Sequence, residues 1–370
     1  MASQPRLSIF DGLRGHLLIG MVLVHLSVDP DIDWLLYLSH SKLLFLRDAE
    51  FFVFISGLLV GYLWYQKYTS QAEKKAFLSN RLSTIYRYYL LSAFPIFVLS
   101  LLAGNTFSMT VINILTMQSG GAYSDVLPIY FICFLILGPF VLVEALNRPS
   151  ILFAASFGIY AASQLTALQG FFGFSGAFVA FDIAAWQFLF ISSLLVGRHA
   201  LQIPSYVRGL DAKVIVALLA VITVTFGYLR ITPYFPDPMD PGHQLVGSTA
   251  RFGLHPLYLL RIALIVAFVS IILIREDVWL RPLHRLGHWY FNLSVLRNVG
   301  KYSIQMFVFH VYVLVIYQVV FSWADLMIKT LAALALVVLF IAVPNVVVGL
   351  RRRAAINDAP EASQQKRRVA

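Results

Sequence analysis

Residues 7–27 read LSIFDGLRGHLLIGMVLVHLS, a run long and apolar enough to cross a bilayer, which takes about 20 residues. Three ionisable side chains interrupt it, namely Asp11, Arg14 and His25. An α-helix turns about 100° per residue, so positions three and eleven apart share a face and the three side chains form one stripe. His16 points away from this stripe. Ionisable groups inside a span are costly and by default mark a functional site.

Along the helix axis, Arg14 and His25 are separated by roughly 16 Å, about half of the ~30 Å hydrocarbon thickness. The stripe can therefore connect one aqueous face with the middle or far side of the membrane. For Asp11 and Arg14 alone, the presence of charge in the span has a simpler explanation that needs no functional site. Near the start of a span, long side chains reach the headgroups and an Asp is favoured by the helix macrodipole. This explanation does not extend to His25.

The composition predicts an all-α polytopic membrane protein. Of the 370 residues, 59% are hydrophobic and 12% are charged, and the mean hydropathy is +0.77; a soluble domain has about a quarter of its residues charged. We expect one transmembrane domain over residues 1–350 and a basic, disordered tail over residues 351–370. Apolar runs predict about ten spans, at residues 7–27, 47–66, 84–103, 126–146, 150–169, 182–199, 212–231, 255–274, 301–321 and 327–350.

The net charge of +10 follows the expected topology. Most Lys and Arg residues fall in the loops on the N-terminal side of the ten-span arrangement, whereas the opposite loops are rich in Asp. By the positive-inside rule, both termini are predicted to be cytoplasmic. The charge therefore does not indicate a nucleic-acid partner. Cys133 is the only cysteine, so no intrachain disulfide can form.

Two connections between spans are unusual. Residues 232–254 are rich in Pro and Gly and predict an irregular loop on the outer face, of a length that is often functional. Residues 281–298 mix aromatic with basic side chains, which is typical of an interfacial helix. Its basic residues could bind lipid headgroups or an anionic ligand.

The second span contains DAEFFVFISGLLVG at residues 48–61. Gly57 and Gly61 are one turn apart, a spacing that lets helix backbones approach closely, and we interpret them as packing residues. Glu50 and Ser56 could face a cavity or satisfy local polar groups. His310 in the ninth span could bind a neighbouring helix or belong to a site.

These features together resemble the OpgC-type membrane acyltransferases, a branch of the acyltransferase-3 superfamily. The matching residues are Asp11, Arg14-Gly15, His25, Glu50, residues 54–57, 185–187, 257–261 and 300–310. The spacing of Arg14 and His25 is the most specific part of the match.

The resemblance implies a multi-pass inner-membrane enzyme that moves an acyl group, most often succinyl, from cytoplasmic acyl-coenzyme A to an extracytoplasmic glycan such as a periplasmic glucan. It implies that His25 is the catalytic base, that Arg14 contacts the acyl donor and that Asp11 orients Arg14. Glu50, Ser56 and His310 become candidate substrate-binding residues. The expected partners are the bilayer, acyl-coenzyme A and the glycan, with no tightly bound cofactor and no metal.

The chemistry of the stripe agrees with acyl transfer to a hydroxyl. That reaction needs a base of near-neutral pKa and a positive group for an anionic donor. Direct transfer and a transient acyl-histidine both remain open. The alternative function is a transporter or flippase of a polar or lipid-linked glycan, which would also use intramembrane charge, although we find no related halves in the sequence. A purely structural subunit would leave the stripe unexplained.

Overall fold

The computed structural model describes residues 8–40, 48–68, 70–104, 106–117, 126–136, 148–165, 182–231 and 253–357. These residues form helices and, within those ranges, no strand. The chain divides into two compact units, Met1–Leu46 with Trp289–Ala370 (unit 1) and Arg47–His288 (unit 2). The segment predicted as one domain, residues 1–350, therefore contributes to both units.

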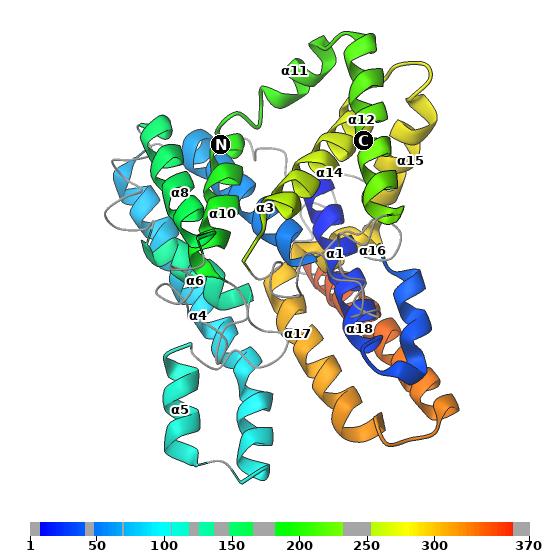
Figure 1. The fold of residues 1–370 in the computed structure, drawn as a ribbon. Coiled ribbons are helices and arrows are strands. Elements are labelled where there is room, and N and C mark those ends of the chain that lie inside the picture. The colour runs from blue at the N-terminus through cyan, green and yellow to red at the C-terminus, as the bar shows by residue number, and fades with distance from the viewer. Residues whose placement is uncertain are drawn as a thin grey trace, which may run out of the picture. The chain divides into compact units, whose positions relative to one another are not determined.

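Unit 1 joins the N-terminal helix to the last helices of the chain. Helices α1, α17 and α18 pack against one another and α16 crosses α1 (Figure 1). The elements are α1 (Ser8–Leu26), the 3-10 helix η1 (Pro30–Leu38), α16 (Ser294–Lys301), α17 (Ser303–Ile316) with the π-helical η4 (Tyr317–Phe321), and α18 (Leu326–Asn357).

The crossing of α1 and α16 is close because glycines lie at the contact. A Cβ atom on Gly300 would overlap the backbone carbonyl of Asp11, and one on Gly15 would overlap the carbonyl of Leu296. Small residues allow this kind of backbone approach between membrane helices. The charged first turns of α1 are thereby fixed against α16.

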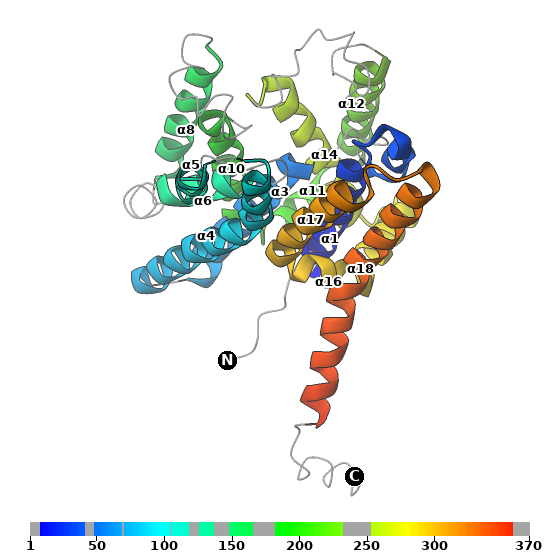
Figure 2. The same ribbon diagram turned by 90° about the horizontal axis from the view of Figure 1, so that it is seen from below.

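Helix α18 is longer than expected. It runs to Asn357 rather than to residue 350, so residues 351–357 of the predicted tail are helical, and Figure 2 shows α18 continuing past the ends of α1 and α17. Asn298 Nδ2 donates to Asn345 Oδ1 at 2.8 Å and ties α18 to α16. The rest of the predicted tail lies outside the described residues.

Unit 2 contains the remaining helices. Its elements are α3 (Asp48–Tyr62) continuing as the π-helical η2 (Leu63–Lys67), α4 (Gln71–Leu102), α5 (Phe107–Leu115), α6 (Val126–Ile136), α8 (Pro149–Ser163), α10 (Ile183–Arg198), α11 (Ile203–Gly209), α12 (Ala212–Ile231), α14 (Pro256–Ile274) and α15 (Arg281–Phe291), which ends in unit 1.

The packing of α3 against α10 confirms the interpretation of the glycine pair. A Cβ on Gly57 would overlap Ser193 Oγ, and one on Gly61 would overlap the carbonyl of Leu194. From the other helix, Gly197 stands equally close to the carbonyl of Leu58. Three glycines thus bring the two backbones together.

The described helices include six that are long and apolar enough to cross a membrane: Ser8–Leu26, Asp48–Lys67, Gln71–Leu102, Pro256–Ile274, Ser303–Phe321 and Leu326–Arg351. The other four predicted spans coincide with shorter apolar helices, Val126–Leu135, Pro149–Ser163, Ile183–Arg198 and Ala212–Thr225. The described part of the chain is therefore built from helices without strands, and several of these helices have the length and apolar character of membrane spans. The number of ten spans and the cytoplasmic location of the termini stay predictions.

The predicted interfacial helix is two helices, α15 and α16. Two of its basic candidates face inward: a ring N–H of His284 donates to the Ile272 carbonyl at 3.1 Å, and one of His288 donates to the Leu273 carbonyl at 2.8 Å. These bonds satisfy carbonyls in the last turn of α14, which have no partner within the helix. The two histidines thus hold α15 against α14, whereas Trp289 is exposed.

The predicted outer loop, residues 232–254, lies outside the described residues except for Gly253 and Leu254. Both are held by α8 and the residue after it, because Tyr160 donates to the Leu254 carbonyl at 3.0 Å and Gln164 donates to the Gly253 carbonyl at 2.8 Å.

Candidate functional site

The charged stripe lies on one uninterrupted helix. Asp11, Arg14 and His25 are all within α1, so the axial separation of roughly 16 Å between Arg14 and His25 applies. Asp11 is buried, whereas Arg14 and His25 are partly buried. Asp11 is buried because it lies where α1 and α16 cross closely at Gly300.

His25 contacts the second intramembrane histidine within unit 1. Its Nδ1 lies 2.7 Å from Nε2 of His310 on α17, and the ring centroids are 4.9 Å apart. His310 is fully buried, and its Nδ1 lies 3.3 Å from the carbonyl oxygen of Phe307. His310 therefore bonds a neighbouring helix, as one of the two sequence interpretations proposed, and the bond is made to the candidate base.

The hydrogen-bond network assigns the tautomers of the pair. A carbonyl oxygen only accepts, so Nδ1 of His310 carries a proton and donates to Phe307. Nε2 of a neutral His310 then accepts, and Nδ1 of His25 donates to it. This leaves Nε2 as the basic nitrogen of His25. In hydrolase triads, too, one nitrogen of the catalytic histidine is held by a neighbouring side chain while the other nitrogen acts as the base.

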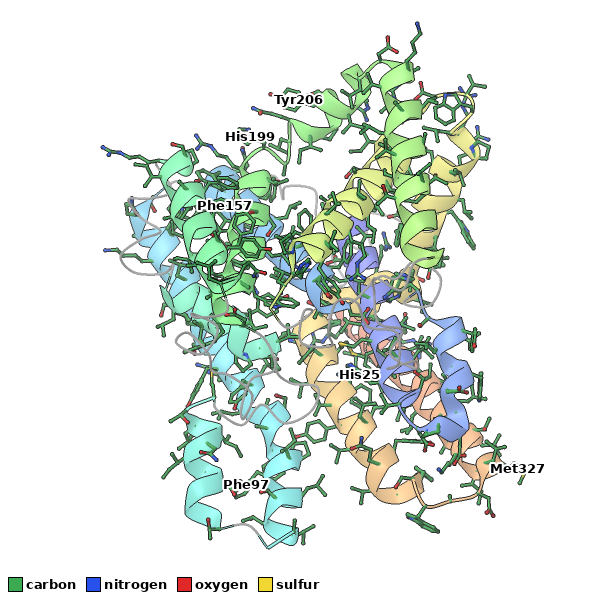
Figure 3. The ribbon with its side chains drawn as sticks, viewed as in Figure 1. His25, Phe97, Phe157, His199, Tyr206 and Met327 are labelled. Carbon is green, nitrogen blue, oxygen red and sulfur yellow. The ribbon has the colours of Figure 1, made fainter. Side chains whose placement is uncertain are left out.

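His25 also lines a cavity of about 350 Å³ at the C-terminal end of α1, beside α17 and η4. Figure 3 shows His25 near that end of α1. The cavity lining combines apolar and polar side chains, the polar ones being His25, Asp29, Tyr317, Gln318, Ser322 and Lys329. Many hydrogen-bonding groups in a concave site suit a ligand rich in hydroxyls.

An ion-paired cluster forms one wall of this cavity. Lys329 Nζ lies 3.1 Å from Asp29 Oδ2 and 2.6 Å from Asp31 Oδ2, and the Tyr317 hydroxyl donates to Asp29 Oδ2 at 2.8 Å. Burial alone would raise the pKa of Asp29. Hydrogen bonds from Tyr317, from the Asp31 backbone N–H and from Lys329 outweigh it and hold that pKa below its usual value.

Two further candidate residues lie in unit 2. Glu50, which is fully buried, has its Oε1 at 3.7 Å from Nη2 of Arg261, itself 3% exposed. The Arg261 guanidinium lies 4.7 Å from the centroid of the Tyr258 ring. Ser56 Oγ donates to the Tyr130 hydroxyl at 3.3 Å. Both residues thus have partners on other helices of unit 2.

Asp29, Tyr317 and Lys329 were not predicted as site residues. Lys329 could have been predicted from the sequence, because an ionisable residue inside an apolar run, here residues 327–350, is a candidate functional residue. Tyr317 starts the π-helical segment η4, a backbone form that is frequent at functional sites but has no clear sequence signature. Within the described ranges, no three His, Cys, Asp or Glu side chains are grouped to hold a metal ion.

Comparison with known proteins identifies the family. The family model described as OpgC protein matches residues 6–112 and 105–353, which together span nearly the whole chain. No curated protein and no solved structure matches. The chain therefore belongs to the OpgC protein family, and this membership implies a membrane-bound transferase with an acyltransferase-like role in glucan modification.

Proposed function

We propose that the protein is an inner-membrane O-acyltransferase that transfers a succinyl group from cytoplasmic acyl-coenzyme A to a periplasmic glucan. The observation that carries this proposal is the bond between His25 Nδ1 and His310 Nε2. This bond leaves Nε2 of His25 to act as a base, and His25 lines a cavity that carries several polar side chains.

In the proposed reaction, His25 Nε2 takes the proton of an acceptor hydroxyl as its oxygen attacks the thioester carbon. The new C–O bond forms, the C–S bond breaks, and the proton on His25 passes to the departing thiolate of coenzyme A. In an acyl-histidine route, the same Nε2 would first attack the thioester carbon and release the coenzyme A thiolate. The hydroxyl oxygen would then attack the acyl carbon, the C–N bond would break, and the hydroxyl proton would pass by way of the freed Nε2 to the thiolate.

His310 is assigned a positioning role in this proposal. Its Nε2 fixes the His25 ring with Nδ1–H pointing inward, and it stabilises the charge that His25 gains as it takes a proton. Full burial of His310 keeps water from competing for that bond.

Within the cavity, Gln318 and Ser322 are exposed polar groups on the lining, and both can donate to and accept from sugar hydroxyls. We assign the cavity to the acceptor. On the predicted topology it opens to the outside, since the N-terminus of α1 is expected in the cytoplasm and His25 lies near the other end of the helix.

The donor is assigned to the inner end of α1. Arg14 supplies a cation for an anionic acyl-coenzyme A, with Asp11 as the residue that orients it. Glu50 and Ser56 are kept as candidate substrate contacts of unit 2. The enzyme would thus carry an acyl group across the membrane while the acceptor stays outside.

Reconstituted vesicles test the proposal. Succinyl-coenzyme A on the side of the termini and glucan on the opposite side should give succinylated glucan. A His25→Ala variant should lose about 10² to 10⁴ in rate. A His16→Gln variant is the matched control on the same helix, because Gln can keep the bond that His16 Nδ1 makes with the Tyr290 hydroxyl at 2.9 Å.

Normal transfer by a well-inserted His25→Ala protein would remove His25 from the mechanism. Movement of unmodified glycan across the membrane, without acylation, would favour the transporter function instead.

A further inference from the structure

A second cavity, of about 420 Å³, lies in unit 2 where the chain passes from η2 into α4, and it has no part in the proposed reaction. Two aromatic rings, an amide and a guanidinium line it, from Tyr68, Phe77, Asn80 and Arg81. The guanidinium, the amide and the Tyr68 phenol are all hydrogen-bond donors. Donors that converge on a concave site suit the oxygen atoms of a phosphate group.

The two aromatic rings of the lining hold cations against them. The ring centroids of Tyr68 and Phe77 are 4.9 Å apart. Arg81 Cζ lies 5.5 Å from the Phe77 centroid, and Lys67 Nζ lies 5.5 Å from the Tyr68 centroid. A cation that already packs on a ring loses less conformational freedom when it binds an anion. Positive charge is therefore ordered at the cavity before a ligand binds.

The surroundings of the cavity favour an anionic ligand over a zwitterionic one. Lys74 Nζ lies 5.2 Å from the centroid of the Trp64 ring, and Lys75 is exposed on the next position of α4. Among the described lining residues, the one carboxylate is Glu73. It accepts a hydrogen bond from the Ser70 backbone N–H at 3.1 Å and closes the capping box that starts α4. The carboxylate that an ammonium headgroup needs is thus engaged at the helix cap.

The length of α4 places the cavity at the level of the lipid headgroups. Its 32 residues extend about 48 Å, against ~30 Å of hydrocarbon. The predicted span begins at residue 84, so the turns that line the cavity lie just outside the hydrocarbon. Aromatic and basic side chains are both favoured at this level. On the predicted topology the cavity belongs to the cytoplasmic leaflet.

One face of α4 leads from the cavity into the hydrocarbon. Asn80 and Thr84 line the cavity, and the exposed apolar side chains Leu91, Phe94 and Val98 follow on the same face, because helix positions separated by three, four or seven residues lie together. From Thr84 to Phe94 the helix rises roughly 15 Å, which is half of the ~30 Å hydrocarbon layer and so the depth of one leaflet. A ligand whose polar end fills the cavity can therefore extend an apolar chain along α4.

We propose that this site binds an anionic glycerophospholipid. Arg81 and Lys67 bind the phosphate, and the Asn80 amide donates to its oxygen atoms or to a headgroup hydroxyl. One acyl chain lies along Leu91 and Phe94, where it covers exposed apolar surface. The proposal concerns unit 2 alone and does not rest on the proposed acyl transfer.

Lipid binding to the full-length protein in detergent, resolved by native mass spectrometry, tests the site. The probes are dioleoyl-phosphatidylglycerol, dioleoyl-phosphatidylcholine with the same chains, and glycerol 3-phosphate, which has no chains. Arg81→Gln and Asn80→Ala change exposed side chains, so both variants should fold. We expect Arg81→Gln to weaken phosphatidylglycerol binding about tenfold, because a charged hydrogen bond to the phosphate is lost.

The matched control is Arg208→Gln. It removes the same charge from an exposed residue of α11, outside the cavity lining and on the side predicted to be cytoplasmic. Its affinity for phosphatidylglycerol should stay within about twofold of the wild type, because exposed charges away from the ligand are screened.

Equal weakening by Arg81→Gln and Arg208→Gln would overturn the site, because the attraction would then come from the overall charge. Unchanged affinity in both cavity variants would overturn it as well. Phosphatidylcholine that binds as tightly as phosphatidylglycerol would refute the selectivity for an anion. Glycerol 3-phosphate that binds as tightly as the lipid would refute the role of the apolar face and assign the cavity to a soluble phosphate. Since none of these measurements involves acyl transfer, each result leaves the proposed function to its own test.

Discussion

Nδ1 of His25 and Nε2 of His310 lie 2.7 Å apart although the residues are separated by 285 positions in the chain. The second nitrogen of His310 lies 3.3 Å from a carbonyl oxygen of its own helix, so Nδ1 of His310 donates to it, and Nε2 of the neutral ring accepts from His25. A single buried ring thereby selects the tautomer of the proposed base.

Replacement of His310 should therefore slow acyl transfer, because His25 would lose the group that fixes its tautomer and orientation. We expect His310→Phe to lower kcat by about tenfold or more, because Phe cannot accept from His25 Nδ1. His310→Gln should restore part of the rate, since its amide oxygen is an acceptor. Turnover of the two variants, each compared at equal folded amounts, checks this. Equal rates for Phe and Gln would show that His310 only fills space.

The Asp29 cluster should make stability depend on acid pH. Hydrogen bonds to Asp29 outweigh its burial and lower its pKa in the folded protein. Its contribution is therefore present above the ordinary pKa of about 3.9 and is lost as the pH falls toward the lower folded value. Unfolding midpoints of the wild type and Asp29→Asn should differ most near neutral pH and converge below about pH 4. A difference that stays constant down to acid pH would contradict this linkage.

Glu50 and Arg261 should behave as a coupled buried pair. Removal of one partner leaves the other charge buried, at a cost of about 3–5 kcal/mol, so Glu50→Leu and Arg261→Leu should each be strongly destabilised. The double variant should lose less than the sum of the single variants. Unfolding in detergent measures all three, with the exposed Lys213→Leu as a control. If the losses in unfolding free energy of the two single variants simply add up in the double variant, the 3.7 Å contact between Glu50 and Arg261 contributes no coupling energy.

Hydropathy predicts where the helices lie, because burial in lipid imposes a run of about twenty apolar residues on each span. All ten predicted runs overlap helices of the structure. Short elements such as η1 and α11 are missed, since their nine and seven residues give no such run. The stripe on α1 follows from helix geometry alone. Its contact with His310 does not, because that contact depends on how α1 packs against α17.

Gly300 should tolerate no side chain. A Cβ there would overlap the Asp11 carbonyl, so Gly300→Ala has to push α16 away from α1. We expect a loss of about 1–3 kcal/mol in stability, the usual range for an overpacked contact. Gly158→Ala is the control, because a Cβ at that helical position meets nothing within 4 Å; it should be neutral or raise stability by about 0.5–1 kcal/mol. Thermal unfolding of both variants in detergent compares them, and equal stability would contradict the tight crossing.

The topology prediction can be checked by labelling single cysteines in a Cys133→Ser background. The basic loop before α4 is expected in the cytoplasm and the loop between η4 and α18 outside, because Lys and Arg are retained on the cytoplasmic side. Lys75 and Asp325 are exposed and serve as the two positions. A membrane-impermeant thiol reagent added to intact cells should label Asp325→Cys at once, and Lys75→Cys only after permeabilisation. The reverse labelling pattern would show that the protein has the opposite orientation in the membrane. The His25 cavity would then have to receive its acceptor from the cytoplasm.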